Sequence, residues 1–416
     1  MQLPPAWLTP APALAREILD HWSRERRTIR QGFTALGICL AVTIMAGVVL
    51  GAMEGLLERL PGLLVLVPSA IGMRGAVFGA LGARLGTGML TGQFTTDWRR
   101  DSFTVQNLEA AGLLTVATAG LSAVLARSVA AVFGLPTISL WALVVVSTVG
   151  ALLSSAVVLG VVLALARTAE RRSWDMDAIG TPIITATADI STLPALVVAT
   201  LALRNAVAAA GMGGVLLAAA AGAAVYGLRS PGTLTRRIVS ESLPVLTYAG
   251  VMGILAGTVL EARIESLVSS PALLVVIPPF IASCGALGGI LSARLASLLH
   301  LGLLSPRSVP ERRAWLEGSL LVLFAVVGFT AVGGLTQLSS LAVGFASPGL
   351  VTLTGVTLVG GLPAAVLLFG VAYYAATTSY RFGLDPDNYG IPMVTASMDF
   401  LGILCLVAAL AILGVR

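Results

Sequence analysis

The sequence predicts an all-α integral membrane protein whose eleven membrane-spanning helices form two parallel five-helix repeats plus one linking helix. Two observations predict this fold. The 416 residues are 57% hydrophobic and only 11% charged, a composition that soluble globular domains do not have. The second half of the chain also repeats motifs of the first, and Asp399 follows its equivalent Asp189 by 210 residues. We therefore expect an internal duplication embedded in a lipid bilayer.

Eleven apolar stretches are long enough to span a membrane. A helix needs about 20 predominantly apolar residues to cross a hydrocarbon core about 30 Å thick. The stretches are approximately 33–56, 62–90, 108–133, 138–166, 178–203, 206–228, 241–261, 271–299, 314–337, 350–379 and 389–414.

These stretches define four parts of the chain. Residues 1–31 are Pro-rich and then basic, and we expect a cytoplasmic amphipathic helix that lies on the membrane surface. The alternative is a solvated basic flank that only sets orientation. Residues 32–205 form the first repeat, residues 206–228 the linking helix, and residues 229–416 the second repeat.

The loop arginines predict the orientation. Most of them fall in segments on the same side as the N-terminus, which the positive-inside rule places in the cytoplasm. The few on the opposite side are Arg59, Arg204, Arg263 and Arg416. The chain should therefore lie in the plasma membrane with its N-terminus inside and its C-terminus outside. The net charge of +5 reflects this orientation, and we expect no nucleic-acid partner.

The repeat also predicts symmetry. Five helices end on the opposite side of the membrane from their start, so a second copy in the same orientation requires one extra crossing. The segment 206–228 supplies that crossing. The two repeats should then be related by a pseudo-two-fold axis along the membrane normal. A single chain would act as a pseudo-dimer, so we expect a functional monomer.

The fifth segment of each repeat holds one carboxylate in an apolar run, Asp189 in the first and Asp399 in the second. Asp177 precedes Asp189 by about 18 Å of helix, which places Asp189 near the bilayer midplane. A charge there costs at least about 3 kcal/mol. Two carboxylates at matched positions indicate a shared polar path.

Hydroxyl groups accompany these carboxylates. Thr181, Thr185, Asp189 and Thr192 share one helical face by their spacing. In the second repeat Thr395 precedes Asp399, and the stripe is shorter. Two facing carboxylates, with hydroxyls that hold a water shell, suit Mg²⁺ because this ion loses water reluctantly. The alternative is polar contact between helices without an ion.

Acidic residues also mark the cytoplasmic end of both fifth segments. Asp177 and Asp387, together with Asp175 and Asp385, precede the apolar runs. They could hold an ion at the mouth of the pathway, or they could only cap the helix N-termini. Both interpretations stay open.

The second segment of each repeat combines proline with glycine. Pro68 and Pro278 each remove a backbone donor inside the membrane, which is tolerated where other groups or a wet cavity satisfy the freed carbonyl. Gly75 and Gly285 follow, and we expect these four residues to line the pathway. Arg74 has no counterpart because Cys284 occupies its place, and the sequence leaves its role open.

These features resemble a known family. The pattern D-x-D-x-x-x-x-P-x-x-T-x-x-x-D, at residues 175–189 and 385–399, and the Pro-then-Gly second segments are similar to the membrane domain of MgtE-type magnesium transporters and channels. The tandem form with a linking helix resembles their eukaryotic solute-carrier relatives. The resemblance implies that Asp189 and Asp399 occupy the pore-ion position. The family usually has asparagine after the glycine, where this chain has Ala76 and Ala286.

The leading hypothesis is therefore transport of a divalent cation, first of all Mg²⁺, through a central pathway at the repeat interface. Such a protein is a transporter or channel and not an enzyme. One alternative is an intramembrane aspartyl protease that uses the same two carboxylates, which could share a proton. Another is a proton-coupled exporter of a small solute.

Overall fold

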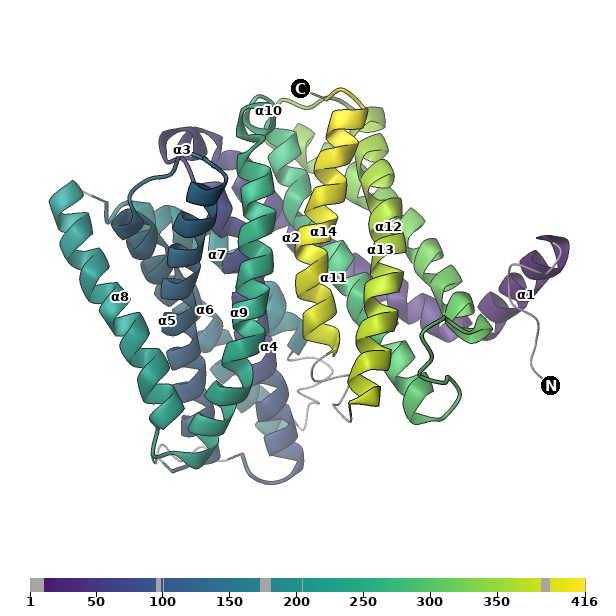
Figure 1. The fold of residues 1–416 in the computed structure, drawn as a ribbon, viewed down its shortest axis with the longest axis horizontal. Helices are drawn as coiled ribbons and strands as arrows, with labels where there is room; N and C mark the ends of the chain where they lie inside the picture. Colours follow the sequence, from purple (N-terminus) through teal and green to yellow (C-terminus); the bar gives the residue numbers. More distant parts are fainter. Residues whose placement is uncertain are drawn as a thin grey trace. The chain divides into compact units, whose positions relative to one another are not determined.

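The computed structural model describes residues 11–94, 99, 101–172, 181–203, 205–382 and 390–415. Within these ranges the chain is helical, with short connections and without strands (Figure 1). Eleven of the described helices are long and apolar enough to cross a membrane. The predicted fold class is confirmed at this level: the chain is an all-helical, multi-pass membrane protein.

Contacts divide the chain into two compact units. Unit 2 is the continuous stretch Ala52–Val268, and unit 1 consists of Met1–Gly51 together with Ser269–Arg416. Unit 2 is thus inserted in sequence between the first spanning helix of unit 1 and the rest of that unit. These boundaries differ from those of the repeats that the sequence suggests, because contacts and not sequence similarity define them.

Unit 2 is a bundle in which α4 packs against α5, α6, α7 and α9, while α8 lies along α5, α6 and α9. Figure 1 shows α5, α8 and α9 running side by side. The helices of unit 2 are α3 (Glu54–Arg59), α4 (Leu63–Leu90), α5 (Phe103–Val132), α6 (Leu140–Arg172), α7 (Thr181–Thr200), α8 (Ala206–Arg229), α9 (Thr233–Glu261) and α10 (Ile264–Val268).

Unit 1 has a matching core in which α11 packs against α12, α13 and α14, and α13 packs against α12 and α14. The short helix α1 contacts the start of α12. The helices of unit 1 are α1 (Ala11–Arg24), α2 (Arg26–Ala52), α11 (Pro271–His300), α12 (Arg312–Val343), α13 (Leu350–Arg381) and α14 (Ile391–Ile412).

Several helices extend beyond the apolar stretches that the sequence marks. The first spanning helix begins at Arg26 instead of residue 33, and α9 begins at Thr233 instead of residue 241. Hydropathy detects only the part of a helix that lies in lipid, whereas arginine and other good helix formers continue it into water. The first span also ends at Ala52, so Glu54 belongs to the separate helix α3.

The first spanning helix of each sequence repeat packs with the later helices of the other repeat. In unit 1, a Cβ added at Gly47 of α2 would lie 2.2 Å from the carbonyl oxygen of Val275 on α11. In unit 2, a Cβ added at Gly257 of α9 would lie 2.2 Å from the carbonyl oxygen of Val65 on α4. Gly257 follows Gly47 by 210 residues, and Val65 precedes Val275 by 210 residues. The same close backbone approach is therefore used twice.

Hydrogen bonds from hydroxyl groups recur in the same way. The hydroxyl of Ser147 on α6 donates to the carbonyl of Ala119 on α5 at 2.8 Å, and the hydroxyl of Thr357 on α13 donates to the carbonyl of Phe329 on α12 at 2.8 Å. Each bond ties two neighbouring helices together where water is excluded, so an unpaired hydroxyl would be costly. The fourth and third helices of both repeats thus share one register.

Candidate ion site

Asp189 lies near the middle of α7 (Thr181–Thr200), an otherwise apolar helix. It is half-buried. Among the described residues we find no hydrogen bond or ion pair to its carboxylate. A carboxylate in hydrocarbon without a donor is costly, so this side chain has the capacity to bind a cation.

Two glycines of α4 lie against Asp189 and Thr185. A Cβ added at Gly75 would lie 3.7 Å from Cγ2 of Thr185 and 3.9 Å from Oδ1 of Asp189. A Cβ added at Gly79 would lie 3.4 Å from Oγ1 of Thr185. Because glycine has no side chain, the carboxylate and the hydroxyl face the bare backbone of α4. The structure therefore brings together the predicted site residues Asp189, Thr185 and Gly75.

Thr192, which the sequence places on the same face, is turned to α6. It is fully buried. Its hydroxyl donates to the carbonyl of Ala188 at 2.6 Å and lies 3.3 Å from the hydroxyl of Ser154. Ser154 in turn lies 3.0 Å from the hydroxyl of Ser191. Thr192 thus belongs to a small hydroxyl cluster between α6 and α7 inside unit 2.

The second copy of the motif lies on α14 (Ile391–Ile412) in unit 1. Thr395 and Asp399 are half-buried, as their equivalents are. The hydroxyl of Thr395 donates to the carbonyl of Pro392 at 3.1 Å. Gly285 has open space around its Cα, since no atom lies within 4 Å of an added Cβ. The position that corresponds to Gly75 is therefore less crowded in unit 1.

The two predicted pathway prolines lie inside spanning helices. Pro68 is within α4, and Pro278 is followed by Pro279 within α11. All three are buried in their units. The hydroxyl of Ser283 donates to the carbonyl of Pro279 at 2.7 Å.

Some predicted site residues lie outside the described part of the chain. Asp177 and Asp387, with Asp175 and Asp385, fall in the two ranges 173–180 and 383–389. Thr181 starts α7, but its side chain is not described. Their predicted roles stay predictions.

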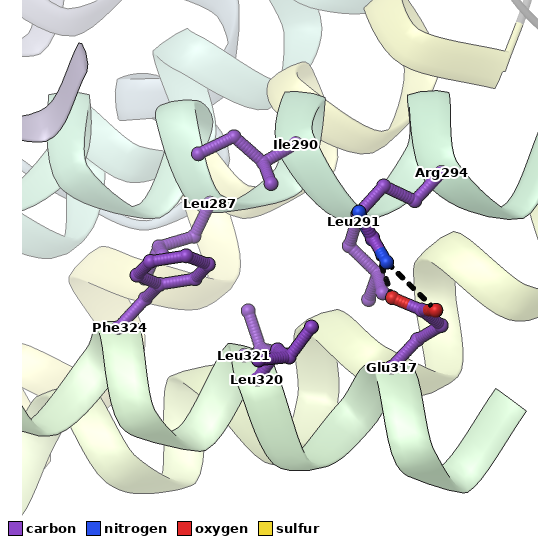
Figure 2. A pocket seen from close by; sticks show the side chains of 8 residues that line it. All are labelled: Leu287, Ile290, Leu291, Arg294, Glu317, Leu320, Leu321 and Phe324. Carbon is purple, nitrogen blue, oxygen red and sulfur yellow. Dashed lines mark hydrogen bonds and ion pairs between the residues drawn. The ribbon is translucent and has the colours of Figure 1, made fainter. Parts of the chain in front are cut away.

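A pocket in unit 1 lies between α11 and α12, and Arg294 and Glu317 close one end of it (Figure 2). Nη2 of Arg294 donates to Oε1 of Glu317 at 2.9 Å, and Nε donates to Oε2. The other end is lined by the apolar side chains of Leu287, Leu321 and Phe324 (Figure 2). Because the carboxylate already accepts two charged hydrogen bonds, this pocket is a packing feature and not a cation site.

Sequence reasoning missed two carboxylates that stabilise helix ends. Glu317 was one, and it pairs with Arg294. In the first repeat, the equivalent residue Asn107 accepts a hydrogen bond from Nε of Arg84 at 2.8 Å. Comparison of the two repeats could therefore have pointed to Glu317. Glu261 was the other. It is 5% exposed, and its Oε1 accepts from the backbone N–H of Gly62 at 2.7 Å.

Metal coordination by several side chains is not found within the described residues, where no group of three or more His, Cys, Asp or Glu could hold an ion. Each unit supplies one carboxylate within its membrane-spanning helices at the fifth-segment motif. A hydrated ion that keeps much of its water shell fits such sparse coordination, as Mg²⁺ does.

Comparison with known proteins identifies the family. The family model for MgtE, described as a divalent cation transporter, matches residues 67–199 and 277–409. The two matched stretches start 210 residues apart, as expected for a tandem duplication. Comparisons with curated proteins and with solved structures each found no match. Because the model matches well over half of the chain, in both halves, this protein belongs to the MgtE family of divalent cation transporters.

Proposed function

We propose that this protein carries Mg²⁺ across the membrane along a central pathway at the interface of the two repeats, with Asp189 and Asp399 as the ion-holding groups. The observation that carries the proposal is the Asp189 carboxylate. It is half-buried in a spanning helix, has no described partner, and faces the bare backbone at Gly75. Asp399 repeats the motif on α14.

The flanking residues have distinct proposed roles. Thr185 and Thr395, with Thr181, would accept or donate hydrogen bonds to the water shell of the ion. Asp177 and Asp387 would attract the ion at the cytoplasmic mouth. The wall of the pathway would be formed by Pro68, Gly75, Pro278, Gly285 and Thr192. Support comes from the chemistry of Mg²⁺, which binds through one or two carboxylates and several waters.

Cell-level features follow from the sequence. The arginine distribution supports a location in the plasma membrane with the N-terminus in the cytoplasm and the C-terminus outside. The duplication supports action as a monomer, because one chain already contains both copies of the motif.

The primary test is flux. The variants Asp189→Asn and Asp399→Asn remove one charge each with little change of shape, and we expect each to lower Mg²⁺ flux into proteoliposomes by at least 100-fold. The control is Asp20→Asn, which makes the same change at an exposed position on α1. Wild-type flux in both site variants, with intact protein, would reject the site.

A second test addresses the meeting of the two carboxylates. Cys39, Cys284 and Cys405 are first replaced by serine or alanine. Asp189→Cys and Asp399→Cys are then introduced together. If the two positions face one ion, Cd²⁺ should bind to the double variant far more tightly than to either single variant. Equal binding to all three would reject a shared site.

The alternatives can be separated in the same preparation. A flux that needs no pH gradient argues against a proton-coupled exporter, and Asp189-dependent uptake of an organic solute argues for one. Cleavage of a membrane-spanning reporter that Asp189→Asn abolishes would instead support the protease.

A further inference from the structure

Arg74 is a charged side chain buried inside unit 2, and it has no partner among the residues that the structure describes. Its side chain is on α4, near the middle of the spanning segment, and the residue is only 6% exposed. Its Nη1 atom has no hydrogen-bond partner. Among the described residues we find no hydrogen bond or ion pair to any atom of its guanidinium. Placing an unpaired charge there is expensive, so a purely structural purpose would be served better by an apolar residue.

The face of α4 that carries Arg74 is turned to the interior of unit 2. Phe78 and Leu81 follow it by four and seven residues and so share its face. Both are buried in the core cluster that α4 forms with α5, α6, α7 and α9. Gly75, the next residue after Arg74, lies against Asp189. The positive charge of Arg74 and the negative charge of Asp189 therefore occupy the same level of the same unit without pairing.

Unit 1 has a neutral residue at this position. Cys284 takes the place of Arg74 by the spacing of 210 residues. Its sulfur lies 3.0 Å from an added Cβ at Gly402, which is the equivalent of Thr192. Unit 1 thus has the thiol of Cys284 and the bare backbone of Gly402 at these two positions. Unit 2 has the guanidinium of Arg74 and the hydroxyl of Thr192 there. The position equivalent to Arg74 in unit 1 therefore carries no positive charge.

We propose that Arg74 is a built-in positive charge that weakens cation binding at Asp189, so that the two carboxylates of the duplicated motif hold the ion unequally and Asp399 holds it more tightly. This inference rests on the proposed function. At an effective dielectric near 20, repulsion between a guanidinium and a divalent ion weakens binding by well over about tenfold for any separation up to roughly 10 Å. A weaker second position lets a divalent ion leave a pair of acids that would otherwise retain it.

The test compares the concentration of Mg²⁺ at half-maximal flux, and Mg²⁺ binding measured by calorimetry, in the purified full-length chain. Arg74→Met removes the charge and retains a long, unbranched side chain. We expect it to tighten binding and lower the half-maximal concentration at least roughly tenfold. Arg74→Lys keeps the charge and should behave as the wild type does. Cys284→Arg adds the charge to unit 1 and should weaken binding.

Two further variants complete the design. Arg127→Met removes an equal charge from an exposed position of α5 and should leave both quantities unchanged. If Arg74→Met does not fold, Arg74→Cys replaces it, because unit 1 carries cysteine at this position.

The outcomes separate the inference from the proposed function. If Asp189→Asn abolishes flux but Arg74→Met leaves affinity unchanged or weakens it, the inference is wrong and the ion site stands. An unchanged affinity in Arg74→Lys together with a tighter Arg74→Met confirms that charge, and not shape, is responsible. If Asp189→Asn changes neither flux nor binding, the ion site itself is rejected.

Discussion

Units 1 and 2 differ in which polar residues they bury. Several buried polar side chains of unit 2 have equivalents in unit 1 that are apolar, small or uncharged, although unit 1 has buried polar residues of its own, such as Ser283. Six of the buried polar residues of unit 2 show this difference: Ser69, Arg74, Thr115, Thr118, Ser122 and Thr192. Their equivalents are Pro279, Cys284, Ala325, Gly328, Val332 and Gly402.

The contacts that hold the helices together are, by contrast, alike in the two units. Gly47 and Gly257 approach a backbone carbonyl at the same distance, and Ser147 and Thr357 donate to equivalent carbonyls. Contacts to the backbone constrain a residue by size and by hydrogen bonding, so few substitutions are tolerated there. After a duplication, these helix–helix contacts are therefore retained, while the buried polar residues of the two copies can diverge.

The largest expected effect tests whether the close helix contacts at Gly47 and Gly257 are equally important in the two units. Gly47→Ala and Gly257→Ala would each place a Cβ 2.2 Å from a backbone oxygen, which only a helix displacement can relieve. We expect each variant to lose about 3 kcal/mol of stability or more, seen as a large drop in Tm of the detergent-solubilised protein. Gly37→Ala, on α2 with open space around it, is the control. A tolerated Gly257→Ala beside a damaging Gly47→Ala would break the similarity of the two units.

The next effect concerns the C-terminal parts of α4 and α11. Arg84 pairs with the neutral Asn107, whereas Arg294 pairs with Glu317, whose side chain is 6% exposed. Glu317→Ala leaves a partly buried guanidinium with Glu25 and the hydroxyl of Thr28, so it should cost about 2 kcal/mol. Glu317→Asn recreates the unit 2 pair and should cost less. Equal Tm values for these two variants would contradict the comparison.

A smaller effect concerns the start of α4. Glu261 accepts a hydrogen bond from Gly62, whereas the equivalent N–H, that of Ala272 in unit 1, donates to the carbonyl of Ala346. Glu261→Ala removes the acceptor and should cost about 1 kcal/mol or slightly more. Glu54, its sequence counterpart, is only half-buried, and Glu54→Ala should change Tm little. A larger loss from Glu54→Ala than from Glu261→Ala would contradict this comparison.

The smallest effect is a pH dependence confined to unit 1. The hydrogen bond from Thr28, and the positive charge of Arg294, lower the pKa of Glu25 below its ordinary value of 4.5, against the opposing effect of burial. A lowered folded pKa stabilises the fold above the unfolded pKa, and this stabilisation disappears as the pH falls through the folded pKa. Glu25→Gln should therefore reduce Tm slightly at pH 7 and not at the acid end. A difference that grows toward low pH would contradict this.

Much of the fold could be predicted because lipid imposes a simple rule. Every backbone polar group must be satisfied within the segment, so long apolar stretches become helices, and all eleven are found. The packing of the first spanning helix of each repeat with helices of the other repeat could not be predicted. The equivalents Gly47 and Gly257 would fit either Val65 or Val275, and sequence similarity between repeats cannot choose between equivalent partners.

The candidate site was predictable in part for the same reason. The duplicated motif singled out Asp189 and Asp399, and the spacing of proline and glycine singled out Gly75, which does lie against Asp189. Residues that act by long-range contact, such as Glu261 with Gly62, carry no local pattern. Arg74 was visible as an unmatched charge, but only burial without a partner suggests its role.

The placement of α2 with the C-terminal helices has a consequence for synthesis at the ribosome. Unit 2 is complete once Val268 has been made, whereas α2 leaves the translocon first and finds its neighbours only after Ser269. The gap of about 220 residues takes roughly 10 to 40 s at 5 to 20 residues per second. During that interval Val275, against which Gly47 packs in the folded protein, has not yet been synthesised. The first spanning helix of unit 1 must therefore remain without its partners while the whole of unit 2 is synthesised.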